Sequence, residues 1–310
     1  MKFKYFFLLL ILTSCFNENK TIFGGKVLNT TSEYISIYKG DNKVDETSID
    51  NLGYFEITLD SIKPGLYSFY HQPEFQHFIL DKFDNLMIRL NTLDFDESLV
   101  YTGKGSSKNN FLMDVFLRNE RDEVIINSNL DNSVTVFKKL IDSLYNNQYK
   151  FYKEFRINNN VSKTTNDIIE SAILYPYLSK YHSYFIRNNL NENDQNYCLS
   201  DYKKKISFNN ENLSHFKPYI DFIYLHIYND VKNNNNFISL IDFNKLRLLK
   251  TDKLIQSSTV KSRVLRFHAI GFLLQREKDS TNNQFINIFN EVSKDKILNL
   301  EIYNLYNEMK

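Results

Sequence analysis

The stretch Tyr54-Phe55-Glu56-Ile57-Thr58-Leu59 alternates between apolar and polar side chains from Phe55 onward. A β-strand turns successive side chains to opposite faces, so Phe55, Ile57 and Leu59 share one face, which we expect to be buried. The same alternation recurs over residues 33–38 and 86–90. This period of two predicts several short strands in the N-terminal third of the chain.

Turn residues separate these runs at spacings of about eight to twelve residues, which is typical of a β-sandwich. They are Gly40-Asp41-Asn42, Asp50-Asn51-Leu52-Gly53, Lys63-Pro64-Gly65 and Asp81 to Asn85. We therefore predict an antiparallel β-sandwich over residues 21–104.

From Ser106 onward the apolar residues recur at helical spacing. Ser106 or Ser107 is a candidate N-cap for the first helix, and Asp131 or Ser133 opens the second. Further helices are predicted at 165–189, 194–206, 213–230, 238–250, 256–276, 282–294 and 296–309. The predicted fold class is α+β, with the sandwich followed by an all-α helical domain over residues 105–310.

The N-terminus has the layout of a secretory signal peptide. Lys2 and Lys4 precede an apolar run from Tyr5 to Leu12, and Leu12-Thr13-Ser14-Cys15 resembles a bacterial lipobox. We expect residues 1–14 to be a lipoprotein signal peptide, Cys15 to carry acyl chains such as palmitate, and residues 15–20 to form a tether. The alternatives are cleavage without lipidation, or a core helix. A spanning helix needs about 20 apolar residues, more than this run offers.

The composition argues against nucleic acid as a partner, because 38 basic residues are balanced by 37 acidic ones. The densest basic cluster, Lys203-Lys204-Lys205, fits a solvated helix face. Cys15 and Cys198 are the two cysteines, and no Cys-x-x-Cys pair is present. We expect Cys198 to be a buried small residue. The sequence identifies no catalytic residue, cofactor or metal ion.

Three polar motifs admit a functional interpretation. His71 and His77 flank a predicted hairpin and, with Glu74, are candidate metal ligands, although a polar loop is the default interpretation. Asp94-Phe95-Asp96-Glu97 lacks the glycine of a calcium loop. Gly103 to Lys108 lacks the spacing of a phosphate-binding loop and predicts a strand-to-helix turn.

Two helical stretches are rich in aromatic residues, which we expect to lie mainly in the core. A cleft between the sandwich and the helices would let some of them bind a peptide or a glycan. The two stretches contain Tyr175, Tyr177, Tyr181, Tyr184 and Phe185, and then Tyr219, Phe222, Tyr224, Leu225 and Tyr228.

The β half also carries Gly25-Lys26-Val27, Asp50 to Ile57, Pro64-Gly65-Leu66-Tyr67 and Leu99 to Gly105, and Thr259 to Arg266 follows among the helices. With the lipobox ahead of them, these segments resemble the N-terminal region of envelope lipoproteins in the TlpA-type thiol–disulfide oxidoreductase family. In that family a C-terminal thioredoxin-like domain supplies the Cys-x-x-Cys. The chain reaches Lys310 without one, so the resemblance implies a non-catalytic relative or a fragment, and no catalytic residue is carried over.

These features predict a lipoprotein of the cell envelope, anchored to the inner or outer membrane on its periplasmic or outer face. Its expected role is to bind or dock an envelope protein or peptide. The alternative is a nutrient-capture lipoprotein, for peptide or glycan, beside an outer-membrane transporter. A purely structural component is a third reading.

Overall fold

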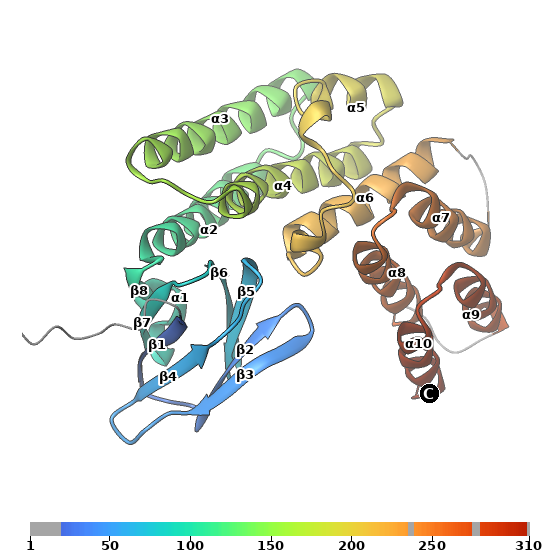
Figure 1. Cartoon of the computed structure of the whole chain (residues 1–310). Coiled ribbons are helices and arrows are strands. Elements are labelled where there is room, and N and C mark those ends of the chain that lie inside the picture. The colour runs from blue at the N-terminus through green and yellow to red at the C-terminus, as the bar shows by residue number, and fades with distance from the viewer. Residues whose placement is uncertain (1–19, 235–238, 275–279, 309–310) are drawn as a thin grey trace, which may run out of the picture.

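The computed structural model describes residues 20–234, 239–274 and 280–308 (Figure 1). In these residues the segment from Thr21 to Lys104 forms two four-stranded sheets. The first sheet has the order β4-β1-β7-β8 and the second the order β3-β2-β5-β6. In chain order the strands are β1 (Thr21–Leu28), β2 (Tyr34–Lys39), β3 (Asn42–Ser48), β4 (Tyr54–Leu59), β5 (Gly65–His71), β6 (Glu74–Leu80), β7 (Asn85–Asn91) and β8 (Val100–Lys104).

The two sheets share one hydrophobic core, which confirms the alternation seen in the sequence. Phe55, Ile57 and Leu59 are buried, whereas Glu56 and Thr58 between them are exposed. Phe23 of β1 stacks on Phe78 of the opposite sheet, with 4.7 Å between ring centroids. Burying such aromatic side chains supplies most of the stabilisation of a layer this thin.

The prediction of a purely antiparallel sandwich is wrong at one pair, because β1 and β7 run parallel. A parallel pair needs a long crossover connection, and here β2 to β6 provide it. The backbones approach closely at Gly25, where an added Cβ would lie 2.1 Å from the carbonyl oxygen of Ile88. Alternation is the same in parallel and antiparallel strands, so the sequence pattern could not distinguish them.

Helices follow from Ser106 onward, close to the predicted ranges (Figure 1). A short helix, α1 (Phe95–Ser98), lies between β7 and β8. The others are α2 (Ser106–Asn127), α3 (Val134–Asn158), α4 (Lys163–Asn188), α5 (Glu192–Leu199), α6 (Lys217–Asn234), α7 (Leu240–Leu254), α8 (Ser258–Leu273), α9 (Ser280–Val292) and α10 (Lys296–Glu308).

Several predicted helix ends are corrected. The N-cap of α2 is Gly105, which has a φ of 98° and no side chain, so neither Ser106 nor Ser107 caps it. The helix predicted at 194–206 ends at Leu199, and the one predicted from 213 begins at Lys217. Between them lie turns and two short 3-10 helices, Lys203–Lys205 and Glu211–Leu213. Ser133, one of the two predicted candidates, occupies the N-cap position of α3, although its side chain makes no capping hydrogen bond.

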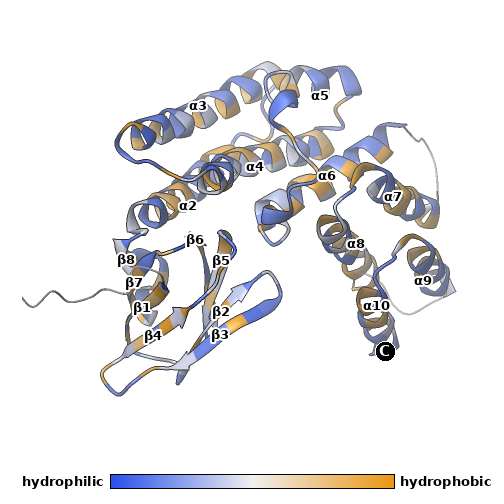
Figure 2. Ribbon diagram, in the orientation of Figure 1, coloured by the Kyte–Doolittle hydropathy of each residue, from blue (hydrophilic) through white to orange (hydrophobic). Residues whose placement is uncertain are grey.

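Helix α4 is the centre of the helical region and packs against α2, α3 and α6. The buried apolar residues of these helices belong to one core cluster. Hydrophobic and hydrophilic residues alternate along the helix ribbons (Figure 2). A second apolar cluster joins α7, α8, α9 and α10. Within the described ranges, no helix has the length and apolar character needed to cross a membrane.

Candidate functional site

Strand β6 joins the sheets to the helices, because its two faces belong to different cores. Phe78 and Leu80 point into the sandwich core. Ile79, on the opposite face, is fully buried in the helical core, and the ring of His77 lies 6.2 Å from that of Phe216. The sandwich is therefore packed directly onto the helices.

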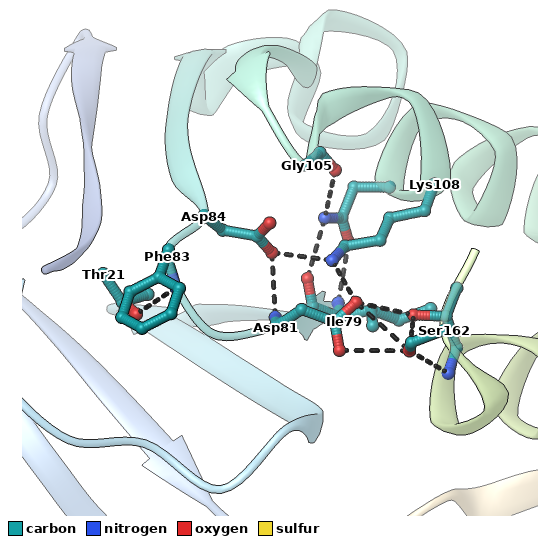
Figure 3. A network of polar contacts seen from close by, with 10 residues as sticks. Thr21, Ile79, Asp81, Phe83, Asp84, Gly105, Lys108 and Ser162 are labelled. Atoms are coloured by element: carbon teal, nitrogen blue, oxygen red, sulfur yellow. Dashed lines mark hydrogen bonds and ion pairs between the residues drawn. The ribbon is translucent and has the colours of Figure 1, made fainter. Parts of the chain in front are cut away.

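A buried ion-pair network locks the same junction (Figure 3). Lys108, in the first turn of α2, lies 2.6 Å from Asp81 Oδ2 and 2.6 Å from Asp84 Oδ2 in the β6–β7 turn. Asp81 also accepts hydrogen bonds from Ser162 and Thr165 at the start of α4. Asp81 thus joins three segments distant in sequence, through Lys108 to α2 and through Ser162 and Thr165 to the start of α4, which fixes both helices relative to the sheets.

Beside this junction lies a groove formed by two adjoining cavities, which we call the interdomain groove. The first, of about 390 Å³, lies between β6, α2, α4 and the start of α6. The second, of about 780 Å³, lies between α4, α6 and α8. Glu123, Pro176, Lys180 and Pro218 line both, so the two cavities adjoin at these residues. Each volume is in the range of small-ligand sites.

The floor of the first cavity is apolar. Met113, Phe116 and Leu117 of α2 face Phe216, and Phe75 of β6 stands at the rim with 58% of its surface exposed. Methionine and aromatic side chains adapt to ligands of different shape, and they are common at peptide-binding surfaces. Burial lowers the pKa of His77 in this wall to about 4, so its imidazole is neutral at pH 7.

The charges of the groove divide into paired and unpaired ones. Toward the second cavity, Lys180 pairs with Glu123 at 2.5 Å, Lys217 pairs with Asp221, and Arg266 pairs with Glu301 at 2.6 Å. Around the first cavity stand Glu74, Asp96 and Glu120, which are exposed and make no ion pair with any described residue. The first cavity therefore has an apolar floor and an acidic rim.

The structure separates the aromatic residues that the sequence singled out. Tyr177, Tyr224 and Leu225 line the interdomain groove. Most of the others are core residues, as expected; Tyr175, Tyr181, Tyr184, Phe185, Tyr219 and Phe222 are buried, and the ring of Tyr228 packs against Phe243.

The two histidines of the proposed metal site point to opposite faces of the sheet and do not converge. His71 is fully buried and its imidazole contacts the backbone of Thr31 and Tyr34, whereas His77 lines the groove. The predicted hairpin itself is confirmed between β5 and β6. Among the described residues, no three potential ligands are grouped closely enough to hold a metal ion.

The structure also shows the conformation of the acidic loop, of the glycine-containing turn and of the Cys198 site. Asp94 to Glu97 form a 3-10 turn and α1, with Asp96 on the groove. Gly103 to Lys108 form the predicted strand-to-helix turn, where Lys108 binds internal carboxylates. Cys198 is fully buried as expected, and burial raises the pKa of its thiol to about 12. Cys15 lies outside the described residues.

Residues that sequence reasoning missed are those that close the groove. Met113, Phe116 and Phe216 read as ordinary core positions on the 3.6-residue period, because no local pattern marks which apolar side chain borders a cavity. Comparisons with protein-family models, with curated proteins and with solved structures found no match.

Proposed function

We propose that this chain is a membrane-anchored lipoprotein of the cell envelope, and that it binds an extended peptide segment of an envelope protein in the interdomain groove. The observation that carries the binding role is the interdomain groove, whose first cavity lies between β6 and the helices and whose second cavity lies among α4, α6 and α8. The lipobox at Cys15 supports the anchor.

A peptide fits the groove better than a glycan does. Sugar rings stack on exposed aromatic faces, and among the aromatic residues that line the first cavity Phe75 is exposed whereas Tyr177 and Phe216 are buried, so this cavity offers one such face. The groove instead offers largely apolar cavities flanked by charges, which suit alternating side chains of an extended chain. This weighs against the glycan form of the nutrient-capture alternative, while its peptide form would use the same groove.

We further propose that the role is non-catalytic in the thiol–disulfide sense. The thiolate is the reactive form of cysteine, and a thiol with a pKa near 12 is almost entirely protonated at pH 7. Purified protein should therefore not reduce insulin disulfides, and reduction at a thioredoxin-like rate would contradict this part of the proposal.

The binding role can be tested with an engineered tryptophan, because the chain contains none. Phe75→Trp places a single reporter at the groove, and Tyr54→Trp places a matched, half-exposed reporter on β4 outside it. The panel would contain hexapeptides of basic, acidic and neutral composition, together with maltohexaose and cellohexaose.

We expect at least one peptide to shift the Phe75→Trp emission to shorter wavelength in a saturable manner, with no change in the Tyr54→Trp protein. No saturable shift with any peptide, or equal shifts in both proteins, would refute peptide binding in the groove. A shift with an oligosaccharide alone would favour the glycan-capture alternative.

A further inference from the structure

The wall of the interdomain groove includes the edge of a β-sheet. In the sheet order β3-β2-β5-β6, strand β6 pairs with β5 on one side and lies at the edge on the other. It is also on the side of the sandwich nearest the helices (Figure 1). An edge strand presents backbone N–H and C=O groups that a further strand can pair with.

The contacts of Ile79 show which backbone groups of β6 face this edge. Its N–H donates to Oδ1 of Asn109 at 2.7 Å, and its C=O accepts from Nδ2 of Asn109 at 2.9 Å. Both groups therefore point away from β5. Residues two apart in a strand direct their backbone groups to the same side, so those of His77 and Phe75 face the same edge.

The edge is closed at Ile79 by the Asn109 side chain. At the His77 carbonyl it is covered by the Gln76 amide, which also donates to Met113 Sδ at 3.1 Å, and it opens into the groove at Phe75. Four consecutive residues of β6, Glu74 to His77, line the first cavity. Because strand side chains alternate between faces, consecutive lining residues mean that the cavity runs along the strand edge. The carbonyl of His77 accepts from the Gln76 side chain at 3.2 Å; the N–H of His77 and both backbone groups of Phe75 have no such partner among the described residues.

The surroundings of this open edge define the side chains that a partner strand should carry. Met113, Phe116 and Phe216 offer an apolar seat, which suits a phenylalanine or leucine. The unpaired carboxylates of Glu74, Asp96 and Glu120 stand around the same cavity, and they complement lysine or arginine.

We propose that the partner segment binds by strand addition, pairing with both backbone groups of Phe75 and with the N–H of His77 on the edge of β6, and that it carries basic and apolar residues in alternation. The main-chain hydrogen bonds would set its direction and register, and the side-chain seats would select its composition. This inference rests on the groove being a peptide-binding site, as proposed above.

The test uses acetyl-(Lys-Phe)₃-amide as the probe and acetyl-(Glu-Phe)₃-amide and acetyl-(Gln-Phe)₃-amide as controls, titrated into the Phe75→Trp protein. Two further probes carry N-methyl groups on all lysine or on all phenylalanine nitrogens, which removes the donors along one edge of the peptide. We expect the basic peptide to bind about 10-fold tighter than the acidic one. Of the two N-methylated peptides, one should bind about 10-fold more weakly than the unmethylated basic peptide, and the other should stay within about 3-fold of it.

Protein variants test the same edge from the other side. His77→Pro removes an N–H that faces the groove and makes no bond to β5, so an edge strand should tolerate it. His77→Ala removes the side chain and keeps the N–H. Both variants lack the imidazole that lines the first cavity, so they differ in the backbone N–H. We expect His77→Pro to bind the basic peptide about 10-fold more weakly than His77→Ala does, and equal affinities of the two variants would overturn pairing at the His77 N–H.

Charge recognition is tested by the triple variant Glu74→Gln, Asp96→Asn, Glu120→Gln. Its matched control is Glu56→Gln, Glu154→Gln, Glu291→Gln, which neutralises three exposed acids outside the groove. Only the first triple should abolish the preference for the basic peptide.

Saturable binding that ignores both N-methylation patterns would overturn strand addition and leave the groove as the binding site. Equal affinity for basic and acidic peptides would overturn the inferred composition of the partner. Binding of none of the peptides would overturn the proposed function as well.

Discussion

Lys108 should be among the most costly polar residues to remove. Its side chain is 7% exposed, and it lies 2.6 Å from a carboxylate oxygen of both Asp81 and Asp84 (Figure 3). Replacing it with methionine keeps most of the volume and leaves the two carboxylates facing each other. Removing one partner of a buried ion pair costs about 3–5 kcal/mol.

The remaining contacts place the expected cost at the lower end of that range. Asp81 keeps its hydrogen bonds from Thr165 and Ser162, and its side chain is 21% exposed. Asp84 keeps only the backbone N–H of Asp81 at 2.8 Å, and its side chain is 6% exposed. We therefore expect Lys108→Met to lower the free energy of unfolding by about 3 kcal/mol at pH 7.

The loss should depend on pH in a defined direction. Burial raises the pKa of Asp84 even with Lys108 beside it, and removing the lysine raises it further. A carboxyl group with a raised pKa holds its proton more tightly in the folded state than in the unfolded state, so stability falls as pH rises through that pKa. The penalty of Lys108→Met should therefore be smallest in acid, where Asp84 is protonated, and largest at neutral pH.

Urea unfolding followed by far-ultraviolet circular dichroism, at pH 7 and pH 4.5, measures both effects. Adding Asp84→Asn to Lys108→Met should recover about 1–2 kcal/mol at pH 7, because the amide removes the buried charge and can still accept from Asp81. A penalty below about 1 kcal/mol at pH 7, or one that is the same at both pH values, would refute this reasoning.

Phe23→Ala should lower the free energy of unfolding by about 3–5 kcal/mol in the same urea assay, because Phe23 is fully buried between the two sheets. Asp41→Asn should lower the free energy of unfolding by less than about 1 kcal/mol, because this exposed carboxylate, between β2 and β3, pairs with His215 and Arg263 near solvent. A larger loss of stability would contradict the small contribution expected of an exposed ion pair. Cys198 should react slowly with Ellman's reagent in the native protein and quickly in urea, because burial raises the pKa of its thiol to about 12; fast native labelling would contradict its burial. Cys15→Ala should leave the circular dichroism spectrum unchanged and move the protein from the membrane to the soluble fraction of its own cells, and continued sedimentation with membranes would rule out lipidation as the anchor.

Local order was readable from the sequence because it depends on neighbours a few residues apart. The alternation of Phe55, Ile57 and Leu59 predicted a strand with one buried face, and the structure confirms it. The helical period after Ser106 predicted the succession of helices, with errors mainly where short turns interrupt residues 200–216. Helix ends were predicted less accurately; for example, Gly105 rather than Ser106 or Ser107 is the N-cap of α2.

Features that join distant segments were not readable in this way. Strand alternation carries no information on direction, so the parallel pairing of β1 with β7 emerged only in the folded chain. The partners of Lys108 lie 24 and 27 residues away, and no spacing rule marks them.

The sequence by itself determined the class of the fold, the order of its two parts and the candidate anchor at Cys15, since each follows from short-range patterns. Only the tertiary structure decided where the sheets meet the helices, which apolar side chains border the interdomain groove, and that part of the β6 edge borders it. A groove is a property of surfaces brought together from β6, α2, α4, α6 and α8, and its walls are chosen by long-range packing rather than by the period of any one segment.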